Sequence, residues 1–327
     1  MAANITYREA LNQALREELQ NNPDVFIIGE EVAQYGGAYK VTEGLYKEFG
    51  PERVVDTPIS EEGIAGCGIG AAMLGLRPVV EMMTVNFTLL AMDQIVNNAA
   101  KLRYMSGGQF QIPAVIRTPQ SLGLQLGAQH SQSLEAWYAH VPGLKVIAPA
   151  TPADAKGLLK SSIRDNNPII FLENEMLYGT KGEVPEGELF IPIGKADVKR
   201  QGKDITLISY SMMLIQAMKA ADTLAKEGID VEVLDLRTLR PLDAESILAS
   251  VKKTHKAVIA EADWKSCGMG AEVTSIILSG AFDYLDAPVV RVALAEVPMP
   301  YSKPLEKAAI PTADDIAAAV RKIMGKG

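Results

Sequence analysis

The sequence predicts an α/β protein of two domains, and three observations support this fold class. Short runs rich in β-branched residues alternate with helical stretches along most of the chain. These runs are continuously apolar, as expected for a parallel sheet that helices cover on both faces. The alternation lapses once, in a loop rich in glycine, proline and charge from Asn174 to about Gly202, and then resumes. A chain of 327 residues is also long enough for two domains.

The first domain is predicted over residues 1–185 and begins with an amphipathic helix. Thr6 and Glu9 have the spacing of a capping box at the start of that helix. Ligands of parallel sheets collect at the carboxyl ends of the strands, so the residues that follow each strand matter most for function. The buried strands expected in this domain are 25–28, 54–56, 78–83, 114–117, 144–148 and 169–172.

A linker is predicted over residues 186–203, and the second domain over residues 204–327. The alternation of strands and helices there again indicates an α/β unit. The strands expected in this domain are 205–209, 231–236, 257–262 and 289–293. The helices expected in it are 214–226, 244–251, 272–278 and 314–323.

Composition argues against several classes of function. Acidic and basic residues are interspersed and the net charge is -8, which disfavours nucleic acid or an anionic membrane as a partner. No apolar run approaches the roughly 18 residues that a membrane-spanning helix needs. Cys67 and Cys267 are the only cysteines. We therefore expect no disulfide framework and no zinc site, and we interpret both as buried packing residues in a reducing compartment.

The most informative segment runs from Val55 to Gly66, where an apolar strand leads into paired carboxylates and a glycine-rich helix. Pro58 favours extended backbone before it, and the Ser60 side chain is expected to cap a helix that begins at Glu61. Glu61 and Glu62 have two interpretations at this point. They complement the helix dipole, or one of them meets a ligand. The glycines that follow favour the ligand, because they let another chain or a flat cofactor approach closely.

The chain lacks the motifs of a complete nucleotide site. The glycines around Gly68 have the wrong spacing for the dinucleotide fingerprint, and no Walker lysine is present. His130 is predicted in a loop after the strand 114–117, where a histidine is either structural or able to exchange protons near neutral pH. Phe87 lies in an apolar stretch that is typical of a core or of a subunit interface.

Seven segments together resemble one family: Gly29–Ala33, Asp56–Glu61, Met83–Phe87, Met105–Gly108, Gln129–Gln132, Arg164–Pro168 and Val297–Tyr301. The chain resembles, over nearly its whole length, the beta subunits of two-subunit thiamine diphosphate-dependent 2-oxo acid dehydrogenases, and above all those of pyruvate dehydrogenase. The resemblance implies a transketolase-like pyrimidine-binding domain followed by a domain like the transketolase C-terminal domain. It also accounts for the missing phosphate motif, since in this family the alpha subunit holds the diphosphate and magnesium.

The resemblance assigns roles to individual residues. Glu61 matches the catalytic glutamate that hydrogen-bonds the aminopyrimidine ring of thiamine diphosphate, and Ile59 and Phe87 match apolar neighbours of that ring. His130 matches the active-site histidine at the reacting end of the cofactor, where it would bond a developing oxyanion or supply a proton. Relatives also hold a structural potassium ion, mainly by carbonyl oxygens. Those carbonyls correspond to Ala114, Ser162, Ile163, Asp165 and Asn167.

The resemblance also implies partners. With an alpha subunit in a two-alpha, two-beta tetramer, the chain would decarboxylate pyruvate oxidatively and acetylate the lipoyl domain of a dihydrolipoyl acetyltransferase core. Asp286 matches a residue that docks a basic segment of that core, whereas the polar ending 325–327 departs from the apolar ending common in the family. We expect no nucleic-acid or membrane partner and a bacterial cytoplasmic location, although a processed organelle protein shares these features.

Two alternatives stay open. Acetoin and branched-chain 2-oxo acid dehydrogenases share the equivalents of Glu61 and His130, although residues 105–108 and Gln129 favour pyruvate as the substrate. The other alternative is a noncatalytic scaffold that only bridges the alpha subunit and the acetyltransferase core. A scaffold has no need of a glutamate or a histidine at these two positions, which weighs against it.

Overall fold

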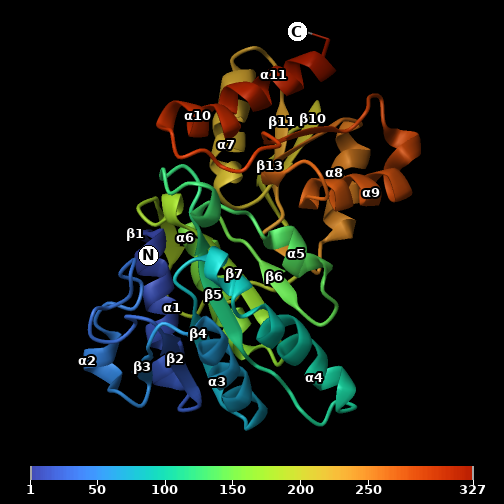
Figure 1. The fold of residues 1–327 in the computed structure, drawn as a ribbon. Helices are drawn as coiled ribbons and strands as arrows, with labels where there is room; N and C mark the ends of the chain where they lie inside the picture. Colours follow the sequence, from blue (N-terminus) through green and yellow to red (C-terminus); the bar gives the residue numbers. More distant parts are fainter. Residues whose placement is uncertain (1, 326–327) are drawn as a thin grey trace. The chain divides into compact units, whose positions relative to one another are not determined.

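The computed structural model describes residues 2–325, which divide into two compact units. The first unit comprises the chain through Leu122 together with Trp137–Ile193. The second comprises Gly123–Ala136 and the chain from Gly194 onward. Each unit has its own sheet with helices packed on it (Figure 1), which confirms the predicted α/β class. The domain limits predicted from the sequence, 1–185 and 204–327, remain a prediction. The polar ending 325–327, which differs from the apolar ending common in the family, lies partly at residues 326–327, outside the described residues.

The first unit is built on a sheet whose strands follow the order β6-β7-β5-β4-β2-β3, and every neighbouring pair is parallel. Most residues of these strands are buried and many are apolar, as predicted, but buried charged residues, Glu81, Arg117 and Glu173, interrupt the apolar runs of β4, β5 and β7. Helix α1 packs on α6, and α3 packs on β4 and β2. The strands are β2 (Val25–Gly29), β3 (Val54–Asp56), β4 (Arg77–Glu81), β5 (Val115–Gln120), β6 (Lys145–Ile147) and β7 (Ile169–Asn174). The helices are α1 (Tyr7–Asn21), α2 (Leu45–Phe49), α3 (Glu61–Met73), α4 (Ala100–Met105) and α6 (Pro152–Arg164), while α5 covers Glu135–His140.

A second, antiparallel pair of strands in this unit was not predicted. Strand β1 (Ala2–Thr6) pairs with β8 (Lys181–Pro185), which lies in the stretch expected to be loop. This pairing places the residues just before α1 beside residues 181–185. The predicted capping box at that start is confirmed, since Thr6 Oγ1 accepts from Glu9 N at 3.1 Å and Thr6 N donates to Glu9 Oε2 at 2.7 Å.

The second unit has a sheet of order β14-β13-β10-β11-β9. All neighbours are parallel except β9, which runs antiparallel to β11 and also lies in the stretch expected to be loop. Helices α7 and α11 pack together, as do α8 and α9, and each pair also packs on the sheet. The strands are β9 (Asp197–Arg200), β10 (Ile205–Ser209), β11 (Val231–Asp235), β12 (Thr238–Arg240), β13 (Ala257–Trp264) and β14 (Val290–Leu294). The helices are α7 (Ser211–Ala225), α8 (Ala244–Thr254), α9 (Met269–Ala281), α10 (Lys303–Ala309) and α11 (Ala313–Ile323).

The two cysteines depart from expectation. Both Cys67 and Cys267 are exposed free thiols, so the prediction that they are buried packing residues was wrong. Cys67 lies on α3, whose buried face is formed by residues such as Ile64, Ala65 and Gly68, and the cysteine falls off that face. Cys267 has a positive φ of 60° in the turn before α9. Within residues 2–325, no helix is long and apolar enough to cross a membrane.

Candidate functional site

Glu61 is the first residue of α3 and its side chain is only 7 % exposed. Its neighbour Glu62 is exposed, although both belong to the same helical turn. Ser60 is the N-cap, but its side chain makes no capping hydrogen bond, so that part of the prediction was wrong. The ψ angle of Ser60 is 76°, outside the extended range usual for a capping serine, and its hydroxyl lies over Gly63 instead.

A second buried carboxylate accompanies Glu61. Glu30 follows β2, and its side chain is 8 % exposed. Burial raises the pKa of Glu30, and the negative charge of Glu61 raises it further. Asp56, at the end of β3, accepts hydrogen bonds from the backbone nitrogens of Ala33 at 2.6 Å and Gln34 at 3.4 Å. The sequence pattern alone predicts no role for Glu30, although the parallel pairing of β2 with β3 places Glu30 and Asp56 at the same edge of the sheet.

A buried ion-pair cluster lies in the same sheet. Arg117 on β5 is 1 % exposed and pairs with Glu81 on β4 and Glu173 on β7, with 2.8 Å between Arg117 Nη2 and Glu173 Oε2. Tyr178 donates to Glu173 at 2.7 Å. Burial lowers the pKa of Arg117, but the charges of Glu173 and Glu81 outweigh it and hold the pKa above its usual value. The arginine therefore stays charged and fixes the ends of three adjacent strands.

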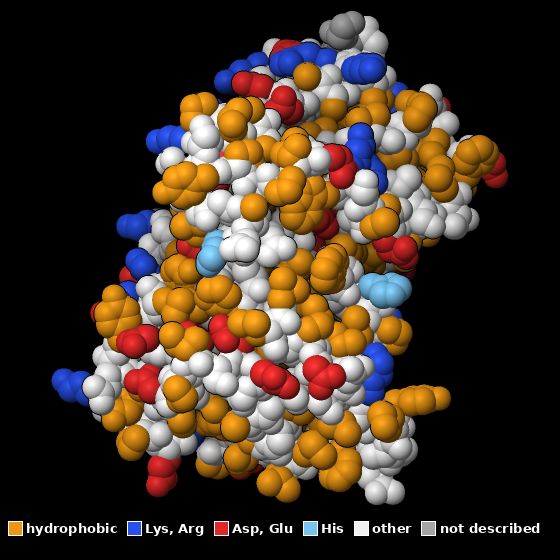
Figure 2. Space-filling view, viewed as in Figure 1, with side chains coloured by type: hydrophobic (Ala, Val, Ile, Leu, Met, Phe, Trp, Pro, Cys, Tyr) orange, Lys and Arg blue, Asp and Glu red, His pale blue; other side chains and the backbone are white. Residues whose placement is uncertain are grey.

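The proposed apolar neighbours of the cofactor differ in exposure. Phe87 is half-buried in a 3-10 helix (Val85–Leu89) after β4, where Thr84 accepts a hydrogen bond from the backbone nitrogen of Asn86. Ile59 is 80 % exposed, only two residues before the buried Glu61. Hydrophobic side chains occupy much of the face drawn in Figure 2. The most exposed ones in the first unit include Ile59, Leu74, Tyr104 and Met105.

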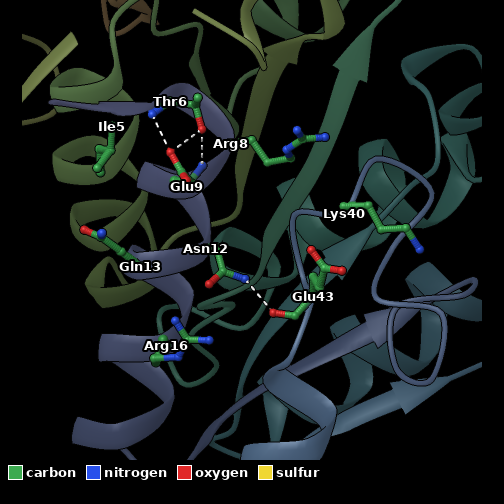
Figure 3. A pocket seen from close by; sticks show the side chains of 9 residues that line it. All are labelled: Ile5, Thr6, Arg8, Glu9, Asn12, Gln13, Arg16, Lys40 and Glu43. Carbon is green, nitrogen blue, oxygen red and sulfur yellow. Dashed lines mark hydrogen bonds between the residues drawn. The ribbon is translucent and has the colours of Figure 1, made fainter. Parts of the chain in front are cut away.

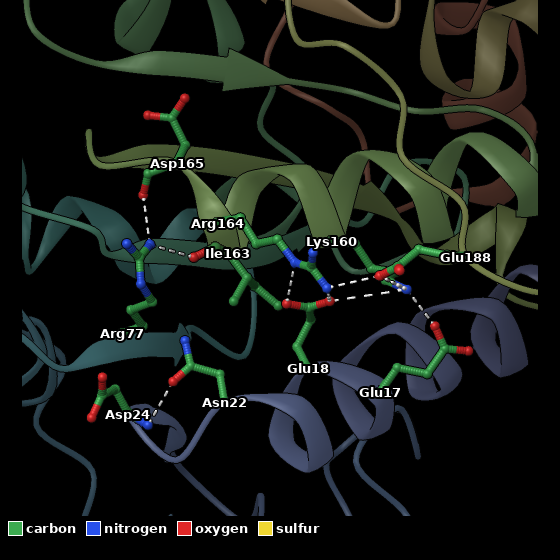
Figure 4. Close-up of polar contacts among 10 residues, drawn as sticks. All are labelled: Glu17, Glu18, Asn22, Asp24, Arg77, Lys160, Ile163, Arg164, Asp165 and Glu188. Atoms are coloured by element: carbon green, nitrogen blue, oxygen red, sulfur yellow. Dashed lines mark hydrogen bonds and ion pairs between the residues drawn. The ribbon is translucent and has the colours of Figure 1, made fainter.

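Four of the five residues whose carbonyl groups are expected to hold potassium, Ser162, Ile163, Asp165 and Asn167, lie at or just after the end of α6, and Arg77 contacts two of these carbonyls (Figure 4). Arg77 Nη1 donates to the carbonyl oxygens of Ile163 at 2.9 Å and Asp165 at 3.2 Å, and its Nη2 donates to Asn166 Oδ1 at 2.6 Å. Two further carbonyls, those of Ala114 and Ser162, accept from backbone nitrogens of Ile169 and Asp165. A potassium ion here would share oxygens with the guanidinium. No cluster of His, Cys, Asp and Glu suited to a metal ion occurs among residues 2–325.

The remaining predicted residues belong to the second unit. His130 ends a short 3-10 helix, Ala128–His130, and is half-buried. Asp286 is exposed at 62 % and forms an ion pair with Lys256, with 3.3 Å between Oδ2 and Nζ. His130 lies in the connection between β5 and α5, where the sequence predicts a loop, and the roles of His130 and Asp286 stay predictions.

A polar cavity of about 420 Å³ lies beside the first half of α1 in the first unit (Figure 3). Three of its polar side chains, those of Arg8, Asn12 and Arg16, hold α1 to the segment 39–48. Arg8 donates to the carbonyl of Tyr39 at 3.2 Å, Asn12 donates to the carbonyl of Val41 at 2.7 Å, and Arg16 pairs with Glu48 at 2.7 Å. We therefore assign this cavity a structural role rather than a ligand.

Comparison with known proteins places these residues in a family. Residues 3–181 match the pyrimidine-binding domain of transketolase, and residues 194–316 match the transketolase C-terminal domain. A solved structure described as a split-gene transketolase, inactive beta4 tetramer, is similar with a TM-score of 0.82 and 25% identity over 99% of both chains.

Three curated relatives are similar over nearly the whole chain. The pyruvate dehydrogenase E1 component subunit beta of Rhizobium meliloti is 54% identical over 99% of this chain and 71% of its own length. The corresponding subunit of Rickettsia felis is 52% identical over 98% of both chains. The mitochondrial subunit of Homo sapiens is 51% identical over 99% of this chain and 91% of its own. The chain therefore belongs to the family of pyruvate dehydrogenase E1 component beta subunits.

Proposed function

We propose that this chain is the beta subunit of a pyruvate dehydrogenase E1 component. With an alpha subunit, it carries out the thiamine diphosphate-dependent oxidative decarboxylation of pyruvate and the reductive acetylation of a lipoyl domain. The observation that carries this proposal is the identity of 51% to 54% with subunits of that name over nearly the whole chain. A buried glutamate at the carboxyl end of the sheet, where ligands of such folds bind, agrees with it.

The residues present fit the pyrimidine half of thiamine diphosphate. Glu61 is a buried carboxylate at the start of α3, and the exposed Ile59 and half-buried Phe87 offer apolar surface. When bound, thiamine diphosphate supplies the carbanion chemistry that decarboxylation requires. Glu61 would hold a proton at the pyrimidine ring nitrogen, and Ile59 and Phe87 would orient the ring by packing. The diphosphate and magnesium would be held by the alpha subunit, since this sequence has no phosphate-binding motif.

His130 would act at the other end of the reaction. A half-buried imidazole on a fixed turn can donate a hydrogen bond to an oxyanion and can transfer a proton near neutral pH. Its expected tasks are to stabilise charge on the pyruvate oxygen and to assist transfer of the acetyl group to lipoyl sulfur. No step is assigned to potassium, because Arg77 already contacts two of the carbonyl oxygens concerned.

The proposal includes partners and a location. The alpha and beta subunits would form a two-alpha, two-beta tetramer in the bacterial cytoplasm, and the bacterial relatives support this origin. The acetyltransferase core would dock on the surface around Asp286. Because Asp286 pairs with Lys256, a basic segment of the core would have to compete with that lysine for the carboxylate.

The test is turnover by the purified chain assembled with its alpha partner, with a lipoyl domain as the acyl acceptor. Pyruvate should be used better than 2-oxoisovalerate or acetoin, and a complex for which pyruvate is the poorest substrate would overturn the assignment. Glu61→Gln should lower kcat by at least about 100-fold. The matched control is Glu62→Gln, which alters an exposed carboxylate on the same turn and should leave kcat near its original value. Full activity of Glu61→Gln would instead support a noncatalytic scaffold.

A further inference from the structure

The loop Gly123–His130, which carries His130, has an unusual backbone. Gly123, Gln125 and Gly127 have positive φ values of 84°, 58° and 78°. Glycine adopts such values without strain, whereas a glutamine does so at a cost. A strained residue keeps its conformation only where its surroundings hold it. The groups that hold Gln125 therefore also set the position of the histidine five residues later.

Glu306 of α10 is the group that holds Gln125. Its side chain is 2 % exposed, and both of its carboxylate oxygens lie 3.1 Å from the backbone nitrogen of Gln125, which donates to them. The described residues give this carboxylate no lysine or arginine partner. Burial of an unpaired carboxylate is costly. Because this glutamate is buried at a cost and accepts from one backbone amide, we infer that its role is to fix the conformation of the loop.

The residues around Glu306 support the same loop at two further points. A Cβ built at Gly127 would lie 3.6 Å from Cδ2 of Tyr301, and one built at Gly123 would lie 3.8 Å from Cδ1 of Ile310. Positions 123, 125 and 127 of the loop thus approach the segment 301–310. Tyr301 closes the motif 297–301, which the family resemblance singled out without giving it a task.

The chain after His130 is held as well. Ser133 Oγ donates to the carbonyl of Ala262 at 2.5 Å, and Glu135 accepts from the hydroxyl of Tyr210 at 3.0 Å. Both partners belong to the second unit, as do the loop and Glu306. Hydrogen bonds therefore hold the chain on both sides of His130, at Gln125 before it and at Ser133 after it.

We propose that Glu306 is a positioning residue for His130. Its carboxylate holds the amide of Gln125, fixes the strained turn, and so places the imidazole for the reaction. This inference rests on the proposed function, because the task of His130 is assigned there. It predicts that loss of the carboxylate loosens the loop and slows the step that uses His130, without weakening substrate binding.

The first test is hydrogen exchange of the loop in the assembled complex. Glu306→Leu, which cannot accept a hydrogen bond, should speed exchange of the 123–129 peptide by about tenfold or more. Glu306→Gln keeps an accepting oxygen and should preserve the protection. Asp243→Asn is the matched control, since Asp243 is also buried and also accepts from backbone nitrogens, those of Ala196 and Ser246, and it should leave the peptide unchanged.

The second test separates positioning from general damage by a double-mutant cycle on lipoyl acetylation. Glu306→Leu should lower kcat by about 10- to 100-fold with KM for pyruvate unchanged. Placed in a His130→Ala complex, the same substitution should have less than about a twofold effect, because the residue it positions is gone. If the leucine variant does not assemble, Glu306→Asp, which retracts the carboxylate by one methylene, takes its place in both tests.

Unchanged exchange of the 123–129 peptide, or an equal loss of kcat with and without His130, would overturn the positioning role. A wild-type complex that does not turn over pyruvate would overturn the proposed function instead. The exchange measurement needs no turnover, so the two failures are distinguishable.

Discussion

Glu61 and Glu62 stand side by side in the sequence but have opposite surroundings. Both complement the positive end of the α3 dipole. Only Glu61 is buried, at 7 % exposure, and only Glu61 raises the pKa of a neighbour, Glu30. Dipole complementation alone does not require burial, so the structure supports a ligand role for Glu61 and leaves Glu62 with the simpler explanation. This contrast is what makes the pair a useful set of matched substitutions.

Three buried carboxylates in the second unit, Glu135, Glu261 and Asp263, form another notable group of residues. Glu261 pairs with Arg291, with 2.7 Å between Oε1 and Nη2, and Glu135 accepts from Tyr210. Burial, reinforced by the charge of Asp263, raises the pKa of Glu135 well above its usual value. Burial also raises the pKa of Asp263 to about 7, and the charges of Glu261 and Glu296 add to this while Arg291 opposes it.

Asp263 should make stability depend on pH. Its folded pKa of about 7 lies above its usual value of 3.8, so the folded state binds the proton more tightly than the unfolded state. The free energy of unfolding should therefore fall as pH rises from about 4 to about 7 and be level above that. Asp263→Asn should flatten this fall and raise the free energy of unfolding at pH 8 by about 1–3 kcal/mol. Urea unfolding of both proteins between pH 5 and 8 measures this dependence of the free energy of unfolding on pH.

Asp243 is the control for that experiment, because its substitution should change the free energy of unfolding in the opposite direction. Burial raises the pKa of Asp243, but hydrogen bonds from Ser246 and Ala196 outweigh burial and hold the pKa below its usual value. Asp243→Asn should therefore lower the free energy of unfolding at pH 8. If both variants shift stability in the same direction, the account of Asp263 is contradicted.

At the scale of elements, the glycines of α3 have two different tasks. A Cβ built at Gly68 would lie 2.4 Å from Cγ2 of Val80, so this glycine lets the helix pack directly on β4. A Cβ built at Gly70 would meet nothing within 4 Å. The first glycine is therefore explained within this chain. The second has no packing reason here and is free to face a partner subunit.

The two glycines should respond differently to alanine. Gly68→Ala should lower the free energy of unfolding by about 1–3 kcal/mol, because Val80 must move. Gly70→Ala should leave it unchanged or raise it by up to about 1 kcal/mol, since alanine is the better helix former. Equal effects in a urea titration would contradict the packing account. Weaker assembly of Gly70→Ala with the alpha subunit would place this face at the partner interface.

Element prediction from the sequence succeeded where burial leaves a local signal. The strands β2, β5 and β10 were found because their buried residues include short apolar runs, which the core covers on both faces. Strands β8 and β9 were missed because they are polar and half exposed, and their pairing depends on residues far away in the chain. A local pattern carries no information about such partners.

The candidate site was predictable to a similar degree. The place of Glu61 follows from its own segment, whereas the role of His130 came only from the family resemblance. The roles of Glu30, Arg117 and Glu306 were not found, because each depends on neighbours brought together by the fold: Glu61 for the first, two carboxylates for the second and a backbone amide for the third.

At the scale of the whole molecule, the chain has candidate residues for the pyrimidine end and the reacting end of the cofactor but none for its diphosphate. Glu61 belongs to the first unit and His130 to the second. The sequence contains no phosphate-binding motif, and its relatives are named as beta subunits of an E1 component. We therefore infer that this chain supplies the pyrimidine-binding half of a site that an alpha subunit completes.

The most direct test of this central claim is calorimetric titration of thiamine diphosphate, with magnesium present, into this chain alone and into its complex with the alpha partner. The account predicts saturable binding by the complex and none by the isolated chain. Glu61→Gln in the complex should weaken that binding less than it slows turnover. Tight binding by the isolated chain would reveal a phosphate site within it and would contradict the shared-site account.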